Sequence, residues 1–391
     1  FNSLVHMDMD RYQQSLPLRR SWLLGTNVGV FPCTLRRAHL LDDAFAAFNQ
    51  CVEEGHSLKA VFRVSFINAE GLPEAGIDGG GVFKEFLDSV VRDVFSPATG
   101  LFCGTPQQML YPNPASASVR PHDHLEYFQF AGRLLGKAVY EGILVEPRFA
   151  GFFLRKLLGR ANQIDDLASL DEEIYRSLLQ LRDYKGNWED LCLTFTSTAP
   201  DGSVRPLIPH GDALPVTSAN VVHYIAALVH DKLNVQIAAQ CTAFLRGFRE
   251  LIPLSWMRMF GASELQTLMG GTERGVDLDD LRAHTNYGGE FHDEHTYIKA
   301  FWRVLHTFSE EDRRNFLMFT TSCSRPPLLG FGSLNPRFGI SPVHITSDDE
   351  KLPSSATCML LLKLPYPYSS EEVLRDKLLL AIRAGAGFEL T

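Results

Sequence analysis

Between residues 37 and 248, apolar side chains recur mostly every three to four positions, which is the spacing of amphipathic helices. Residues 60–66 instead alternate between polar and apolar side chains and predict a strand, and 191–196 is a short apolar run of strand length. Small residues at Gly132, Gly136 and Ala138 predict a helix that packs closely against a neighbour. The periodic segments predict helices over 37–51, from Val82 onward, and over 125–144, 149–158, 170–182, 219–248 (one or two helices) and 263–269.

The pattern changes at 270–275, where Gly-Gly-Thr-Glu-Arg-Gly is a run of turn-forming residues. Beyond it the predicted elements are shorter and of mixed type. Serines stand in capping positions at Ser309, with Asp312, and at Ser369, with Glu372. We therefore expect an α+β fold with a large, mainly helical N-terminal part, a flexible hinge and a smaller α/β C-terminal part. Its predicted elements are helices over 296–306, 310–319 and 369–384 and strands around 338–340 and 358–364.

Composition narrows the function classes. The chain is 45% hydrophobic and 21% charged, within the range of globular proteins. Its 46 acidic and 37 basic residues give a net charge of −9, so a basic surface for nucleic acid is not expected. No apolar stretch is long enough to predict a membrane span, and no signal peptide is visible. The seven cysteines are too far apart for a CxxC pair and indicate reduced thiols, hence a cytoplasmic or nuclear location.

Two patterns that suggest a cofactor are incomplete. The glycine-rich segment 76–81 lacks both the GK[ST] ending of a phosphate loop and the spacing of a dinucleotide-binding turn. Histidines cluster at 122–124 and 292–295, but neither group completes a zinc-ligand set. We therefore expect no cofactor and no metal site.

Cys358 differs from the other cysteines in its setting. A polar loop ending at Thr357 runs into the apolar segment that follows Cys358, so the thiol lies where a loop meets a strand. Such a junction can expose a nucleophile on a rigid base. A cysteine beside Met-Leu-Leu-Leu is, however, usually a small core residue. On the residues alone, both interpretations stay open.

Five segments together resemble the HECT family of ubiquitin-protein ligases, in order and in spacing, from about residue 37 to 391. The amino-acid sequence of residues 322–331 is most similar to that of the family branch whose ligases act alongside the proteasome. The five segments are GIDGGGVFKEF at 76–86, FQFAGRLLGKA at 128–138, IKAFW at 298–302, FTTSCSRPPLLGF at 319–331 and LPSSATC at 352–358.

The resemblance implies a bilobal HECT fold and a transfer of ubiquitin. The N-lobe would span 1–271, with a conjugating-enzyme-binding subdomain at about 150–228, a hinge would follow at 272–275, and the C-lobe would span 276–391. Cys358 would accept ubiquitin as a thioester and pass it to a substrate lysine. The implied partners are a ubiquitin-conjugating enzyme, ubiquitin, a protein substrate and, through the branch, the proteasome.

The resemblance also marks residues that support the transfer, namely Thr357, Arg325 and Phe388. Arg325 would steady the catalytic loop or the ubiquitin tail, or simply form a structural ion pair. Phe388, fourth from the end, would help to place the lobes, or only pack the tail. Many relatives carry histidine two residues before the cysteine, but this chain has Ala356, so no base is available there.

The resemblance also implies a groove that binds the conjugating enzyme. Each residue of this groove could equally be an ordinary residue of the hydrophobic core. Two other functions remain open from the sequence: a cysteine hydrolase acting on ubiquitin or acyl esters, which needs a histidine partner, and a non-catalytic interaction module. The groove residues implied by the resemblance are Ile174, Ser177, Leu178, Leu191, Leu193, Tyr224 and Leu228.

Overall fold

The alternation predicted over 60–66 forms strand β2 (Val61–Ile67), which pairs in parallel with β1 (Val30–Arg36). Apolar residues at alternate positions of both strands are buried, and helix α3 (Leu40–Glu53), entered through the turn η1 (Arg37–His39), connects them. This computed structural model describes residues 1–15, 29–68, 71–74 and 81–384. Residues 76–80, the start of the 76–86 segment, lie outside the described residues.

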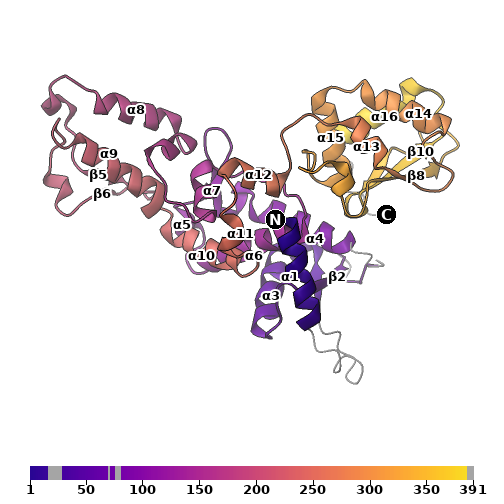
Figure 1. Cartoon of the computed structure of the whole chain (residues 1–391), viewed down its shortest axis with the longest axis horizontal. Helices are drawn as coiled ribbons and strands as arrows, with labels where there is room; N and C mark the ends of the chain where they lie inside the picture. The colour runs from indigo at the N-terminus through magenta and orange to yellow at the C-terminus, as the bar shows by residue number, and fades with distance from the viewer. Residues whose placement is uncertain (16–28, 69–70, 75–80, 385–391) are drawn as a thin grey trace.

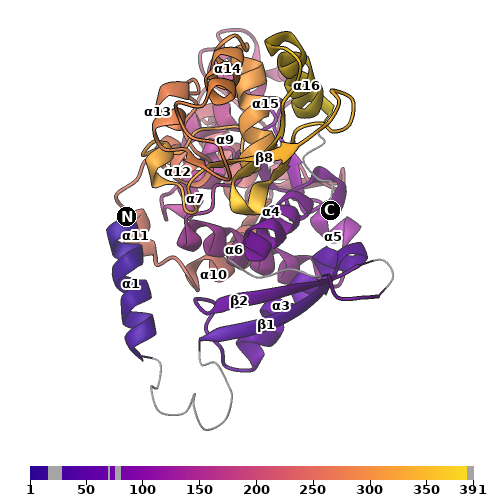
Figure 2. The ribbon, with the colours of Figure 1, turned by 90° about the vertical axis from the view of Figure 1, so that its right-hand side faces the viewer.

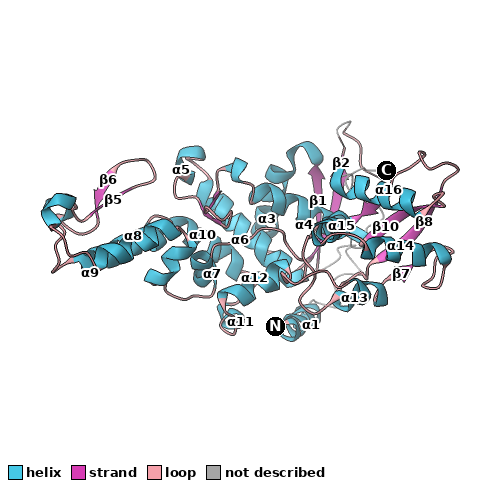
Figure 3. Cartoon of the chain, turned by 90° about the horizontal axis from the view of Figure 1, so that it is seen from above, coloured by secondary structure: helices cyan, strands magenta, loops and turns pink. Residues whose placement is uncertain are grey.

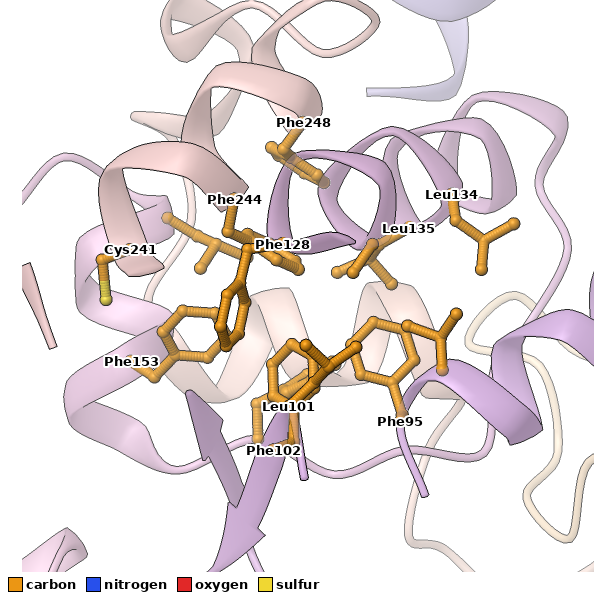
Figure 4. Close-up of a cluster of buried hydrophobic side chains, with 14 of the residues drawn as sticks. Phe95, Leu101, Phe102, Phe128, Leu134, Leu135, Phe153, Cys241, Phe244 and Phe248 are labelled. Carbon is orange, nitrogen blue, oxygen red and sulfur yellow. The ribbon is translucent and has the colours of Figure 1, made fainter. Parts of the chain in front are cut away.

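Helices build the rest of the first core, as the periodicity predicts. Phenylalanines from these helices and from strand β3 (Phe102–Gly104) meet in one buried cluster, which includes Phe102, Phe128, Phe153 and Phe244 (Figure 4). The elements are α1 (Asn2–Ser15), α4 (Gly81–Val94), η2 (Pro97–Thr99), β3 (Phe102–Gly104), β4 (Leu110–Pro112), α5 (Ser116–Val119), α6 (His124–Glu141), α7 (Gly151–Leu157), α10 (Ala238–Arg249), α11 (Leu254–Met257) and α12 (Ala262–Gly270).

Glycines set the distance between α6 and α10. A Cβ atom on Gly132 would fall on the carbonyl oxygen of Phe244, and one on Gly247 would fall on that of Gln129. The two backbones therefore touch where a side chain would otherwise separate them. The close packing predicted from the small residues of 125–144 is confirmed.

A smaller unit projects from the helical body, at the left of Figure 1. The predicted strand over 191–196 is wrong: Leu191 ends a 3-10 turn, Cys192 has a φ of 48°, and β5 begins at Thr196. Of this apolar run Phe195 is buried, and its ring lies 5.4 Å from that of Tyr224 between centres. This unit contains η3 (Ile164–Ser169), α8 (Glu172–Arg182), η4 (Trp188–Leu191), β5 (Thr196–Thr198), β6 (Val204–Pro206), η5 (Gly211–Ala213), α9 (Val221–His230) and the π-helical turn η6 (Asp231–Val235).

The C-terminal part is a four-stranded mixed sheet with helices, and its strand order is β7-β8-β10-β9. The predicted cap Ser309 accepts the Asp312 amide at 3.1 Å. The predicted cap Ser369 is wrong, because Ser370 accepts the Val373 amide whereas Ser369 bonds to Asp348. The elements are α13 (Leu278–Ala283), β7 (Asn286–Tyr287), α14 (Thr296–His306), α15 (Glu310–Thr321), η7 (Phe331–Ser333), β8 (Gly339–His344), β9 (Ser354–Ala356), η8 (Thr357–Met359), β10 (Leu361–Tyr366) and α16 (Glu371–Ala384).

Two separate hydrophobic clusters define two lobes. The first extends from Val5 to Met269 and the second from Val276 to Ile382, so residues 270–275 run between them. We call these lobes the N-lobe and the C-lobe. Figure 2 shows the C-lobe on one side of α4 and the β1–β2 pair on the other, and Figure 3 shows the molecule extended from α8 and α9 to β8. Among the described residues, no helix is both long and apolar enough to cross a membrane.

Candidate active site

Cys358 lies in a tight turn between two antiparallel strands of the C-lobe. Strand β9 pairs with β10 so that Ala356 faces Leu361, and the 3-10 turn η8 joins them. The turn closes through the Leu360 amide, which donates to the Thr357 carbonyl at 3.2 Å, and Leu360 has a φ of 50°. The strand predicted to begin at 358 therefore begins three residues later. The Cys358 side chain is outside the described part of the structure.

The backbone on both sides of Cys358 is firmly held. Thr357 and Leu360 are buried, and the Leu360 carbonyl accepts the Gly339 amide at 2.8 Å. The Ser355 hydroxyl donates to the carbonyl of Phe319 at the end of α15. Thr357, predicted as a support residue, is thus part of the packing that fixes this turn. The backbone turn that carries the cysteine is therefore held on both sides by packing and hydrogen bonds.

The turn that carries Cys358 packs against helix α4 of the N-lobe. On α4, the Lys84 ammonium donates to the Thr321 carbonyl at 3.3 Å, across the boundary between the lobes. One turn further along α4, Asp88 faces Ser322, and its Oδ2 atom is buried without a hydrogen-bond partner among the described residues. Burial raises the pKa of the Asp88 carboxyl to about 6, against smaller opposing effects of Lys84 and the Ser322 hydroxyl.

The raised pKa of the Asp88 carboxyl predicts that the stability of the protein depends on pH. A carboxyl whose pKa is raised in the folded state binds protons more readily there than in the unfolded state. At low pH the Asp88 carboxyl is therefore protonated and does not lower the free energy of unfolding. Its destabilising effect develops as the pH rises from about 4 to about 6 and is complete at neutral pH. We expect Asp88→Asn to raise the free energy of unfolding by about 1–3 kcal/mol at neutral pH and to change it little near pH 4. Urea denaturation at both pH values measures this difference.

The exposed Asp376 provides the matched control for this experiment, since among the described residues its one ion pair is with Arg375 at 3.6 Å. Asp376→Asn should leave the stability unchanged within about 0.5 kcal/mol at either pH. If Asp88→Asn were no more stable than the parent at neutral pH, burial of the charged Asp88 carboxylate would not lower the free energy of unfolding.

A second contact between the lobes surrounds Arg325, another predicted support residue. Its guanidinium donates to the carbonyls of Val145 and Glu146 at 3.2 and 2.8 Å, and the side chain is buried. The neighbouring Ser324 donates to the Glu146 carboxylate through its amide at 3.1 Å and its hydroxyl at 2.7 Å. In this arrangement Arg325 attaches a C-lobe loop to the N-lobe, and it also forms an ion pair with Glu146 at 3.9 Å.

The glycine-rich linker runs beside this loop. Thr272 donates its amide to the Pro326 carbonyl at 2.8 Å, and Gly271 has a φ of 81°. A Cβ atom on Gly271 would lie 2.6 Å from the Pro326 oxygen, and one on Gly270 would lie 2.7 Å from Nη2 of Arg325. Glycine is thus needed for the backbone conformation and for the close approach. The hinge at 272–275 stays a prediction, and its first residue is bonded to the C-lobe loop here.

The seven residues predicted to contact a conjugating enzyme all belong to the small unit that contains α8 and α9, but not all reach the surface. Ser177 is exposed, and Ile174, Leu191 and Leu193 are half-buried. The other three, Leu178, Tyr224 and Leu228, are buried in the core of the unit. These three side chains can support a contact surface but do not form one in this arrangement.

The remaining cysteines are poor candidates for the same chemistry. Burial raises the pKa of the Cys51 and Cys323 thiols to about 11 and that of Cys241 to about 12, so they stay protonated at neutral pH. Cys33 is buried as well, and only Cys192 of the six described cysteines is exposed. Phe388, the third predicted support residue, lies outside the described residues.

Sequence reasoning missed the residues that join the lobes. Asp88 and Lys84 have the spacing of two neighbours on one helix, which also fits a solvated ion pair. Glu146 follows α6 in a loop with no motif of its own. No local signal marks these residues, because their partners lie more than 170 positions away along the chain.

Comparison with known proteins agrees with the resemblance found in the sequence. The family model described as HECT-domain (ubiquitin-transferase) matches residues 88–391. The chain is 46% identical to E3 ubiquitin-protein ligase UPL6 of Arabidopsis thaliana, over 91% of this chain and 35% of that protein. It is 41% identical to human Ubiquitin-protein ligase E3B, over 92% and 36%, and 40% identical to E3 ubiquitin-protein ligase HUL5 of Saccharomyces cerevisiae, over 91% and 39%.

The chain thus spans little more than a third of the length of these relatives. The family match covers both the end of α4 and the whole C-lobe, including the turn at Cys358. With a family model over most of its length and relatives above 40% identity, this chain belongs to the HECT-domain (ubiquitin-transferase) family.

Proposed function

We propose that this chain is a ubiquitin-protein ligase domain in which Cys358 accepts ubiquitin from a conjugating enzyme. The observation that carries the proposal is the position of Cys358, on a rigid turn of the C-lobe that packs against α4 of the N-lobe. The acceptor is therefore held at the boundary of the two lobes, within reach of groups from both. The buried thiols of Cys51, Cys241 and Cys323 offer no alternative acceptor.

The proposed reaction has two steps. The Cys358 thiolate attacks the carbonyl carbon of the ubiquitin thioester, a new C–S bond forms, and the conjugating-enzyme thiolate leaves. Because both thiolates are similar leaving groups, this step is nearly balanced in energy and depends mainly on positioning. A substrate lysine amine then attacks the same carbon, the C–S bond to Cys358 breaks, and an isopeptide bond forms. The amine gives up protons in this step, so a base must accept them.

The partners follow from this reaction. A conjugating enzyme would bind the unit that contains α8 and α9, where Ile174, Ser177, Leu191 and Leu193 are at least partly exposed. Ubiquitin and a protein substrate complete the reaction. An association with the proteasome and a cytoplasmic or nuclear location are further parts of this proposal. Support for them comes from the 322–331 motif and from the six described cysteines, none of which forms a disulfide bond.

A transfer assay tests the function. The chain is mixed with a ubiquitin-charged conjugating enzyme, and the products are separated with and without a thiol reductant. We expect an adduct with the added mass of one ubiquitin, which the reductant removes. Release of ubiquitin from a C-terminal ester probe without any conjugating enzyme would instead identify a hydrolase. The absence of both products would favour a non-catalytic module.

A further inference from the structure

Helix α4 has one face in the N-lobe core and another against the C-lobe (Figure 2). Its apolar face, which includes Phe86, Leu87 and Val91, is buried in the N-lobe cluster. Asp88 lies on the other side of the helix, because about 3.6 residues complete each turn. The C-lobe packs on that side, through the turn at 357–359 and the end of α15. The C-lobe therefore covers the Asp88 carboxyl, whose Oδ2 atom is buried without a partner among the described residues.

The C-terminal end of α15 disfavours a carboxylate beside it. The last carbonyl groups of a helix have no partner within the helix, so this end carries a partial negative charge. Lys84 suits such a position, and its ammonium donates to the carbonyl of Thr321, the last residue of α15, at 3.3 Å. Asp88 faces Ser322, directly after the helix end. A negative charge on Asp88 thus opposes the contact that Lys84 favours.

The charged groups that act most on Asp88 all belong to α4, so they stay beside it whether or not the C-lobe is docked. Two of them favour the carboxylate and one disfavours it. The C-lobe contributes the Ser322 hydroxyl and the neighbouring Cys323, which stays neutral because burial raises the pKa of its thiol to about 11. Removal of the C-lobe would thus mainly return water to the carboxyl. The charged groups on α4 are, in decreasing order of effect, Lys84, Arg92 and Glu85.

We propose that Asp88 is a pH-sensitive latch between the lobes: its neutral acid allows the C-lobe to dock on α4, and its carboxylate favours parting at the predicted hinge. The docked carboxyl, with its raised pKa, binds a proton more readily than a solvated one. Between about pH 4 and pH 6, docking therefore takes up as much as one proton from water. Acidification favours the docked arrangement. This latch concerns the arrangement of the lobes and does not depend on the proposed transfer of ubiquitin.

Single-molecule energy transfer between two fluorophores measures docking in the full chain. The fluorophores are attached to azide-bearing residues at two exposed sites, Glu53 in the N-lobe and Leu380 in the C-lobe, so that the native thiols stay unlabelled. We expect a docked and a parted population. The ratio of docked to parted molecules should rise about tenfold from pH 7.5 to pH 5.0, as the raised pKa of the docked Asp88 carboxyl requires.

Three variants assign this response to Asp88. Asp88→Asn should keep the ratio high at both pH values, because an amide of the same shape carries no charge. Lys84→Met should lower the ratio at least about threefold at both pH values but retain the response to pH. Asp93→Asn is the matched control, since it removes an exposed carboxyl from the same helix, and it should respond as the parent does. The proposal is wrong if the parent shows the same ratio at both pH values or parts in acid, or if Asp88→Asn responds to pH as the parent does.

Discussion

Replacing Cys358 by alanine is expected to abolish the ubiquitin adduct completely, since the one exposed thiol among the described cysteines, Cys192, lies in the small unit and not in the C-lobe. Cys358→Ser should give a more specific result. A serine hydroxyl in the same turn attacks the same carbonyl carbon and forms an oxygen ester, which thiol reductants leave intact and hydroxide cleaves. The measurement is the transfer assay above, with each variant treated by reductant and by mild base.

The exposed Cys192 is the matched control for these variants, because it can react with thiol reagents but lies in the small unit, far along the chain from the C-lobe. Cys192→Ala should form the adduct at the parental rate. An adduct that survives in Cys358→Ala and disappears in Cys192→Ala would reverse the assignment. Loss of the adduct in both variants would indicate damage to the fold, which circular dichroism can detect.

Replacing Gly247 by alanine is expected to destabilise the N-lobe by about 3–5 kcal/mol, although alanine is the better helix former. Helix propensity alone predicts a gain of about 1 kcal/mol. Packing outweighs it, because the new Cβ would overlap the Gln129 carbonyl oxygen and lie 3.0 Å from the Arg133 nitrogen. Both contacts are with backbone atoms of α6, which cannot rotate away. Urea denaturation measures the change, and a loss of this size is a large part of a typical domain's stability.

Gly288→Ala is the control for this experiment. A Cβ at Gly288 would have its nearest neighbours at 3.5 Å and beyond, which is ordinary contact, so its stability should change by less than about 1 kcal/mol. If Gly247→Ala were as stable as Gly288→Ala, α6 and α10 would have to separate at little cost. The close approach of these two helices would then not be a requirement of the fold.

Periodicity predicts most of the long helices, but it gives no prediction for α1 or β1. It located the helices that became α3, α6, α14 and α15, because each has a wide apolar face and a long repeat. It failed at 191–196, where a short apolar run has no period and the turn at Cys192 interrupts it. It also placed Cys358 at the start of a strand, because the apolar residues that follow it do not reveal the closing turn at Leu360.

The site was less predictable than the fold. Motif resemblance pointed to Cys358, but apolar residues of a binding surface and of a core look alike in a sequence. Leu178, Tyr224 and Leu228 illustrate this, since they were assigned to a groove and are buried. The contacts between the lobes, such as that of Ser324 with Glu146, depend on how distant segments fold together.

The separation into two hydrophobic clusters has a consequence for solubility. The clusters do not merge, and the hydrogen bonds across the boundary involve a lysine, an arginine, a serine, a carboxylate and backbone carbonyls. Water solvates all of these groups well. If the lobes part at the predicted hinge, neither core is uncovered, so the apolar surfaces that lead to aggregation stay buried.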